Sequence, residues 1–165
     1  MSRPDRQSAQ QEVVNLSDTA MDQLTPINQL LVWGLRRWRL AMTSREDGLT
    51  AIRPAFEEAH CPQVALAMDE LLNLLSVCAH RSIVVCCPGH GKLTYDELLI
   101  MELLRVSQAG RDALTRSVAS SFVPPRLSAP FCRSVDLLTE ALRRAGYNLA
   151  MRPHLSLVSS STKEA

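Results

Sequence analysis

The sequence of 165 residues contains no long apolar run, carries almost no net charge and has only two lysines, Lys92 and Lys163. No stretch approaches the roughly 20 apolar residues that a membrane-spanning helix needs, and the polar N-terminus lacks the core of a signal peptide. A formal net charge of +1 gives the chain no overall field that would attract nucleic acid or an anionic membrane. We therefore expect a soluble, cytoplasmic protein with no membrane partner, and we do not expect it to bind nucleic acid.

Disulfide bonds are not expected either. The five cysteines are an odd number, and a chain without a secretion signal normally keeps its thiols reduced. The length is that of one domain that can bury a sizeable core. We expect this helical domain to cover residues 19–150, with a flexible N-terminal arm over 1–18 and a partly disordered C-terminal tail over 151–165.

The pattern of apolar residues favours helices in most of the chain. Thr25 can cap a helix that begins at Pro26, because a proline at the first helical position loses no hydrogen bond. Apolar residues then recur at spacings of three and four as far as Met42. This helix carries three arginines that we expect to leave its core face: Arg36, Arg37 and Arg39.

A second, strongly apolar helix is predicted over 62–79 and is the best candidate for the centre of the core. Thr94-Tyr95-Asp96-Glu97 has the pattern of a capping box, which predicts the start of another buried helix that continues to Val106. Shorter helices are predicted over 49–59, 111–122 and 131–145. The expected fold class is all-α, a single-domain bundle of about five or six helices.

One short β-pair is expected beside the turn at 83–94. Residues 83–86 form a β-branched apolar run that is typical of a strand. A single strand needs a partner, and residues 148–151 or 154–158 near the C-terminus are the candidates.

The turn after this run resembles a metal-binding motif. Cys87-Pro88-Gly89-His90-Gly91 is similar to the zinc-knuckle pattern Cys-Pro-x-Cys-Gly, with a histidine in place of the second cysteine. The alternative interpretation is that Cys78 and Cys86 are small core residues and that Cys87 and His90 are ordinary turn residues. No second knuckle completes the site. The candidate ligands for zinc or iron are Cys87, His90, Cys86, His80 and Cys78.

The same turn matches two catalytic patterns only in part. Its order of strand, glycine-rich turn and helix is that of a P-loop, but Cys86 replaces the first glycine and Leu93 follows Lys92 where Ser or Thr is required. Cys87 with His90 as base would form a nucleophilic pair without an orienting third group. We therefore expect no enzyme activity, and the sequence identifies no small-molecule substrate.

The function that the sequence favours is that of a non-catalytic interaction or regulatory protein that acts through a helical surface. Its expected partner is another protein or a second copy of the chain. A metal-binding module is the first alternative. A helix-turn-helix regulator is the second, with helices around the turn at Gly110 and with Arg111 and Arg116 on the second helix, although any helical bundle contains such pairs.

Overall fold

The computed structural model describes residues 16–149, and this range contains six α-helices and a two-stranded antiparallel sheet. The prediction of an all-α bundle with one short β-pair is therefore confirmed. The helices are α1 (Pro26–Thr43), α2 (Gly48–Glu58), α3 (Pro62–Cys78), α4 (Tyr95–Gln108), α5 (Asp112–Ala119) and α6 (Pro125–Arg144). The strands are β1 (Leu16–Ala20) and β2 (Lys92–Thr94), and a short 3₁₀ helix covers Met21–Gln23.

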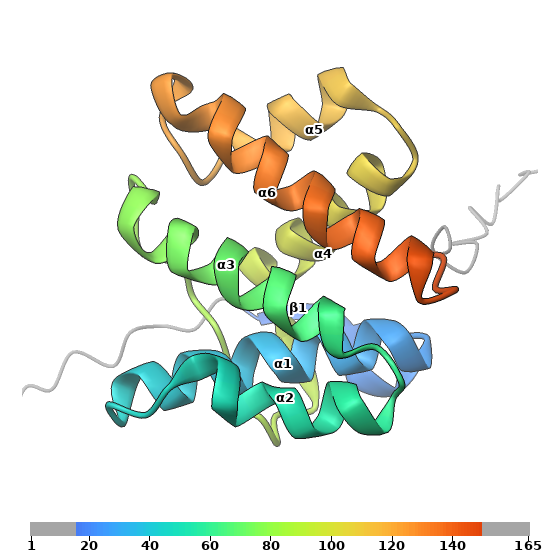
Figure 1. Ribbon diagram of the computed structural model, residues 1–165. Coiled ribbons are helices and arrows are strands. Elements are labelled where there is room, and N and C mark those ends of the chain that lie inside the picture. Colours follow the sequence, from blue (N-terminus) through green and yellow to red (C-terminus); the bar gives the residue numbers. More distant parts are fainter. Residues whose placement is uncertain (1–15, 150–165) are drawn as a thin grey trace, which may run out of the picture.

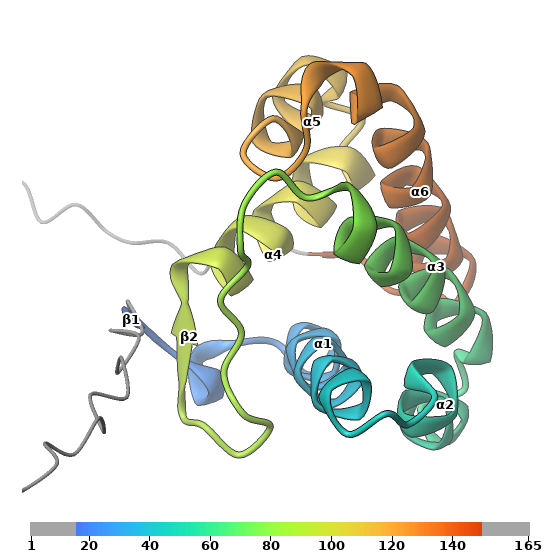
Figure 2. The ribbon, with the colours of Figure 1, turned by 90° about the vertical axis from the view of Figure 1, so that its left-hand side faces the viewer.

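Helix α3 lies in the middle of the bundle, as predicted. It packs against α2 on one side and α6 on the other, while α1 packs on α2, and α4 packs on both α5 and α6 (Figure 1). Figure 2 shows the sheet and the long connection between α3 and α4 at one side of the bundle, next to α1.

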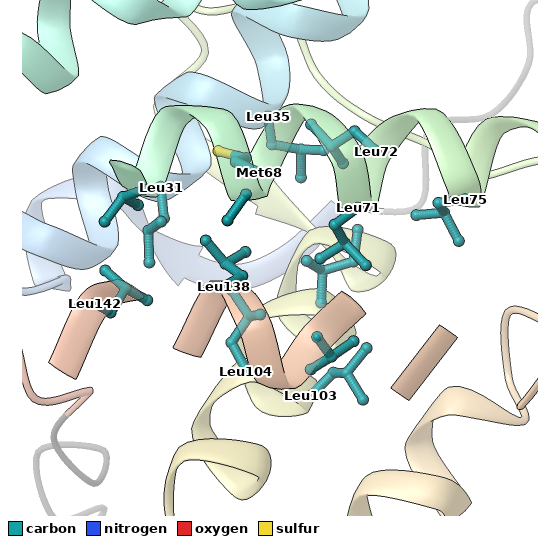
Figure 3. Close-up of a cluster of buried hydrophobic side chains, with 14 of the residues drawn as sticks. Leu31, Leu35, Met68, Leu71, Leu72, Leu75, Leu103, Leu104, Leu138 and Leu142 are labelled. Carbon is teal, nitrogen blue, oxygen red and sulfur yellow. The ribbon is translucent and has the colours of Figure 1, made fainter. Parts of the chain in front are cut away.

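The core is rich in leucine. Figure 3 shows Leu71 of α3 facing Leu104 of α4 and Leu138 of α6, and each of these side chains is no more than 3% exposed. Burial of one such side chain contributes about 1.5–3 kcal/mol relative to an exposed one. The core therefore joins α3 to the C-terminal half of the chain.

Two predicted helix starts are confirmed. Thr25 accepts a hydrogen bond from the amide of Asn28, and Pro26 occupies the first position of α1. At the start of α4, the Thr94 hydroxyl accepts from the Glu97 amide at 3.0 Å, and the Glu97 carboxylate accepts from the Thr94 amide at 2.9 Å. These are the two reciprocal bonds of a capping box.

The last helix begins earlier than predicted. The sequence pattern suggested residue 131, but α6 begins at Pro125, with Pro124 as its N-cap. Because a proline at the first helical position is already in the helical conformation, the pair starts a helix here. Pro130 is accommodated inside α6.

The position of the β-pair also differs from the prediction. Residues 83–86 belong to no sheet, and β1 instead pairs with β2, with Leu16 opposite Thr94 and Ala20 opposite Lys92. Strand β1 thus includes the end of the segment expected to be a flexible arm. Asn148 and Leu149 form no strand, and the other proposed partner residues, like most of the expected arm and all of the expected tail, lie outside the described range.

Candidate functional site

The prediction that Arg36 faces solvent is wrong, because only 1% of this residue is exposed. Its guanidinium forms a bidentate ion pair with the carboxylate of Glu97, at 2.7 Å between Nε and Oε1 and 2.9 Å between Nη2 and Oε2. Both side chains are fully buried. The pair joins the middle of α1 to the first turn of α4.

The same two side chains hold the backbone of the loop that precedes β2. Arg36 donates to the carbonyl of His90 at 2.6 Å and to that of Lys92 at 2.7 Å. Glu97 accepts from the amide of Cys86 at 3.0 Å, in addition to the amide of Thr94. A buried ion pair is tolerated when such additional hydrogen bonds satisfy its remaining donors and acceptors.

The charge on Arg36 depends on this partner. Burial alone would lower the pKa of Arg36, but the hydrogen bonds and the negative charge of Glu97 raise the pKa above its usual value. Removal of the carboxylate would therefore leave a buried cation without compensation.

A second carboxylate, that of Asp96, holds the same loop from the same end of α4. Asp96 forms a bidentate pair with Arg81, at 2.7 Å from Oδ1 to Nη2 and 3.0 Å from Oδ2 to Nη1, and its Oδ2 accepts from the Val84 amide at 2.8 Å. The guanidinium of Arg81 also lies over the ring of Phe122 and donates to the carbonyl of Ser121 at 2.9 Å. The two neighbouring carboxylates of α4 thus fix the connection between α3 and α4, residues 79–91.

This arrangement predicts a loss of stability in acid. Burial alone would raise the pKa of Asp96, but Arg81 and the Val84 amide hold this pKa below its usual value. A carboxylate with a lowered pKa in the folded state stabilises the protein above its unfolded pKa of about 3.9, and the stabilisation is lost as the pH falls through the folded pKa. We expect the free energy of unfolding to fall more steeply below about pH 4 for the wild type than for Asp96→Asn. Urea denaturation at pH values from about 5 to 2.5 measures the difference, and parallel curves would contradict it.

The connection has a one-sided hydrogen-bond pattern. Both backbone groups of Val84 are bonded toward α4, its amide to Asp96 and its carbonyl to the Thr94 hydroxyl at 2.7 Å. The amide of Cys86 is bonded toward α4 as well. Side chains at the start of α4 therefore replace the neighbouring strand that the sequence analysis expected.

A groove lies between this connection, α1 and α3, with a volume of about 430 Å³. Arg39, His80 and Arg81 are the charged or titratable side chains along it, and no acidic side chain lines it within the described residues. The apolar side chains that line it are those of Leu35, Trp38, Leu72, Leu75, Ala79, Ile83 and Val85. Concave sites with apolar walls and a few polar groups are typical binding sites.

The proposed metal ligands are not brought together. Cys78 packs against the core at the end of α3, and the ring of His80 lies 3.1 Å from the carbonyl of Ser120. Cys87 is exposed, and Nδ1 of His90 accepts from the Lys92 amide at 3.1 Å. Within residues 16–149 no three His, Cys, Asp or Glu side chains are close enough to hold one metal ion.

The thiol of Cys86, whose amide is bonded to Glu97, does not have a lowered pKa. Burial and the negative charge of Glu97 raise the pKa of Cys86 above its usual value, against the smaller opposing effect of Arg36. Burial also raises the pKa of Cys61, at the start of α3. Reactive cysteines instead have lowered pKa values, so neither residue has the environment of a nucleophile.

In the sequence, Asp96 and Glu97 are recognisable only as residues that start α4. The ion pair of Glu97 with Arg36 had a weak signal in the sequence of α1. Three of four successive positions there are arginines, so one of them lies on the core side of the helix if the apolar face is wide. The groove had no signal in the sequence, because its walls come from three separate segments.

Comparison with known proteins identified no relative of this chain. No family model, curated protein or solved structure matches this chain. Among the described helices none has the length and apolar character required to cross a lipid bilayer.

Proposed function

We propose that this protein is a small, non-catalytic interaction protein that binds a partner protein in the groove between α1, α3 and residues 79–85. The observation that carries the proposal is the composition of the groove, which has apolar walls and a basic edge without an acidic lining residue. Protein interfaces commonly combine an apolar centre with arginine and a polar rim.

The fixed position of the connection supports this proposal. Residues 79–91 contain no helix or strand, yet their backbone is held by Arg36, Asp96, Glu97 and Thr94. A wall that is held in place before binding loses little conformational entropy when a partner arrives. The carboxylates of Asp96 and Glu97 therefore hold one wall of the groove in place before a partner binds.

Replacement of Ser76 by tyrosine tests the groove directly. Ser76 is exposed on α3 and lines the groove, so the larger side chain occupies the binding space without entering the core. We expect Ser76→Tyr to reduce recovery of the partner from cell extract at least about tenfold, which corresponds to 1.4 kcal/mol. Quantitative mass spectrometry of proteins captured by the wild type and the variant measures the change.

The matched control is Ser117→Tyr. Ser117 is exposed on α5 and does not line the groove. The same partner must be recovered with Ser117→Tyr as with the wild type, and both variants must retain the wild-type circular dichroism spectrum. Equal recovery with Ser76→Tyr and the wild type would contradict the proposed function.

A further inference from the structure

Residues 82–86 have a backbone edge that is bonded toward α4 on one side only. In an extended segment the N–H and C=O groups of successive residues point to opposite sides. The groups of Val84, and the amide of Cys86, are bonded toward α4. Those of Ile83 and Val85 consequently point away from α4.

These outward groups have no partner. Within residues 16–149 the backbone N–H and C=O groups of Ile83 and Val85 form no hydrogen bond. Both residues are half-buried and both line the groove. In Figure 2 the connection runs between β2 on one side and α1 on the other, so the edge that points away from α4 is on the side of α1. An unpaired strand edge is a template for another extended chain.

The charges along the groove favour an acidic chain. Arg39 is exposed and forms no ion pair with another described residue, and His80 lies at the same groove. The third basic side chain, Arg81, is already neutralised by Asp96. A negatively charged segment would meet attraction from Arg39 and no repulsion from a lining carboxylate.

We propose that the groove binds an extended, acidic peptide segment of the partner protein, which pairs as a β-strand with the backbone of Ile83 and Val85. This inference rests on the function proposed above. Strand addition provides affinity through main-chain hydrogen bonds, and the side chains of alternate residues provide specificity. The apolar side chains of the segment lie against Leu72 and Leu75, and its carboxylates face Arg39.

Selection from a random peptide library tests the inference without knowledge of the partner. Displayed peptides of eight residues are selected on the full chain, and those that also bind Ser76→Tyr are removed. We expect the selected sequences to alternate apolar residues with Asp or Glu. Synthetic versions should bind about tenfold more weakly to Arg39→Ala, but equally to Arg53→Ala, which removes an exposed arginine outside the groove.

Amide exchange in the complex identifies the pairing. Exchange at Ile83 and Val85 should slow at least about tenfold when a selected peptide is bound, because hydrogen-bonded amides are protected. The amides of Val84 and Cys86 are internal controls, since Asp96 and Glu97 already bond them in the free protein. N-methylation of the peptide should abolish binding only at alternate positions.

The outcomes separate the two proposals. Selection of helical or basic peptides, or unchanged exchange at Ile83 and Val85, would overturn strand addition while the capture experiment with Ser76→Tyr still supports the groove. Failure to select any groove-dependent peptide would also overturn it. If Ser76→Tyr recovers the partner as well as the wild type does, the proposed function is overturned, because the partner then binds outside the groove.

Discussion

Replacement of Glu97 by glutamine is expected to lower the free energy of unfolding by about 3–5 kcal/mol, the usual effect of removing one partner of a buried ion pair. Glutamine keeps the size of the side chain but removes the charge that compensates Arg36. It also offers one acceptor oxygen, where the carboxylate accepts from Arg36, Cys86 and Thr94. Urea denaturation followed by circular dichroism measures the loss.

Glu140→Gln is the matched control. Glu140 pairs with Arg143 and Arg144 along α6, where both arginines are exposed to solvent. Exposed pairs of this kind contribute little, so the expected change is within about 0.5 kcal/mol. A loss below about 1 kcal/mol for Glu97→Gln would show that the pair with Arg36 is not desolvated as the structure indicates.

Replacement of Gly48 by alanine is expected to cost about 2–4 kcal/mol, through overpacking and the loss of a hydrogen bond. A Cβ atom at this position would overlap Nε1 of Trp38 and lie 2.5 Å from Cδ1 of the same ring. The indole must therefore move. Its Nε1 donates to Oδ1 of Asp69 at 2.7 Å, and this bond between α1 and α3 would be broken or distorted. Thermal or urea denaturation, together with tryptophan fluorescence, measures the effect.

Gly89→Ala separates this contact from a general effect of alanine. A Cβ atom at Gly89 would meet no atom within 4 Å, and its backbone does not require glycine. Its expected effect on the free energy of unfolding is within about 0.5 kcal/mol. If Gly48→Ala and Gly89→Ala were equally stable and had the same fluorescence as the wild type, the close approach of α2 to Trp38 would be incorrect.

The two substitutions with the largest expected losses of stability, Glu97→Gln and Gly48→Ala, both affect residues that form or support the groove. Trp38 lines it, and Glu97 holds the connection that forms its outer wall. Loss of Glu97 should therefore loosen the wall as well as the fold. The groove therefore depends in part on Glu97, a residue that does not itself line it.

Helix positions were largely predictable because their signals are local. Thr25 with Pro26, and Thr94 with Glu97, satisfy free amides within one helical turn, so the residues that mark a helix start are adjacent in sequence. The spacing of apolar residues likewise identified α3 as a buried helix. The start of α6 was missed because a pair of prolines can either end one helix or start the next. Only packing against the rest of the protein selects between the two.

The sequence by itself determined the helical class, most helix boundaries and the capping box, since each depends on interactions within about four residues. Only the tertiary structure decided the partners of Arg36, Ser17 and the connection between α3 and α4. Arg36 and Glu97 are 61 residues apart, and the hydroxyl of Ser17 bonds to the carbonyl of Leu93 across 76 residues. The neighbouring residues in the sequence do not specify such contacts. An arginine that faces solvent and one that pairs in the core can have the same neighbours. The groove arises where these distant segments meet.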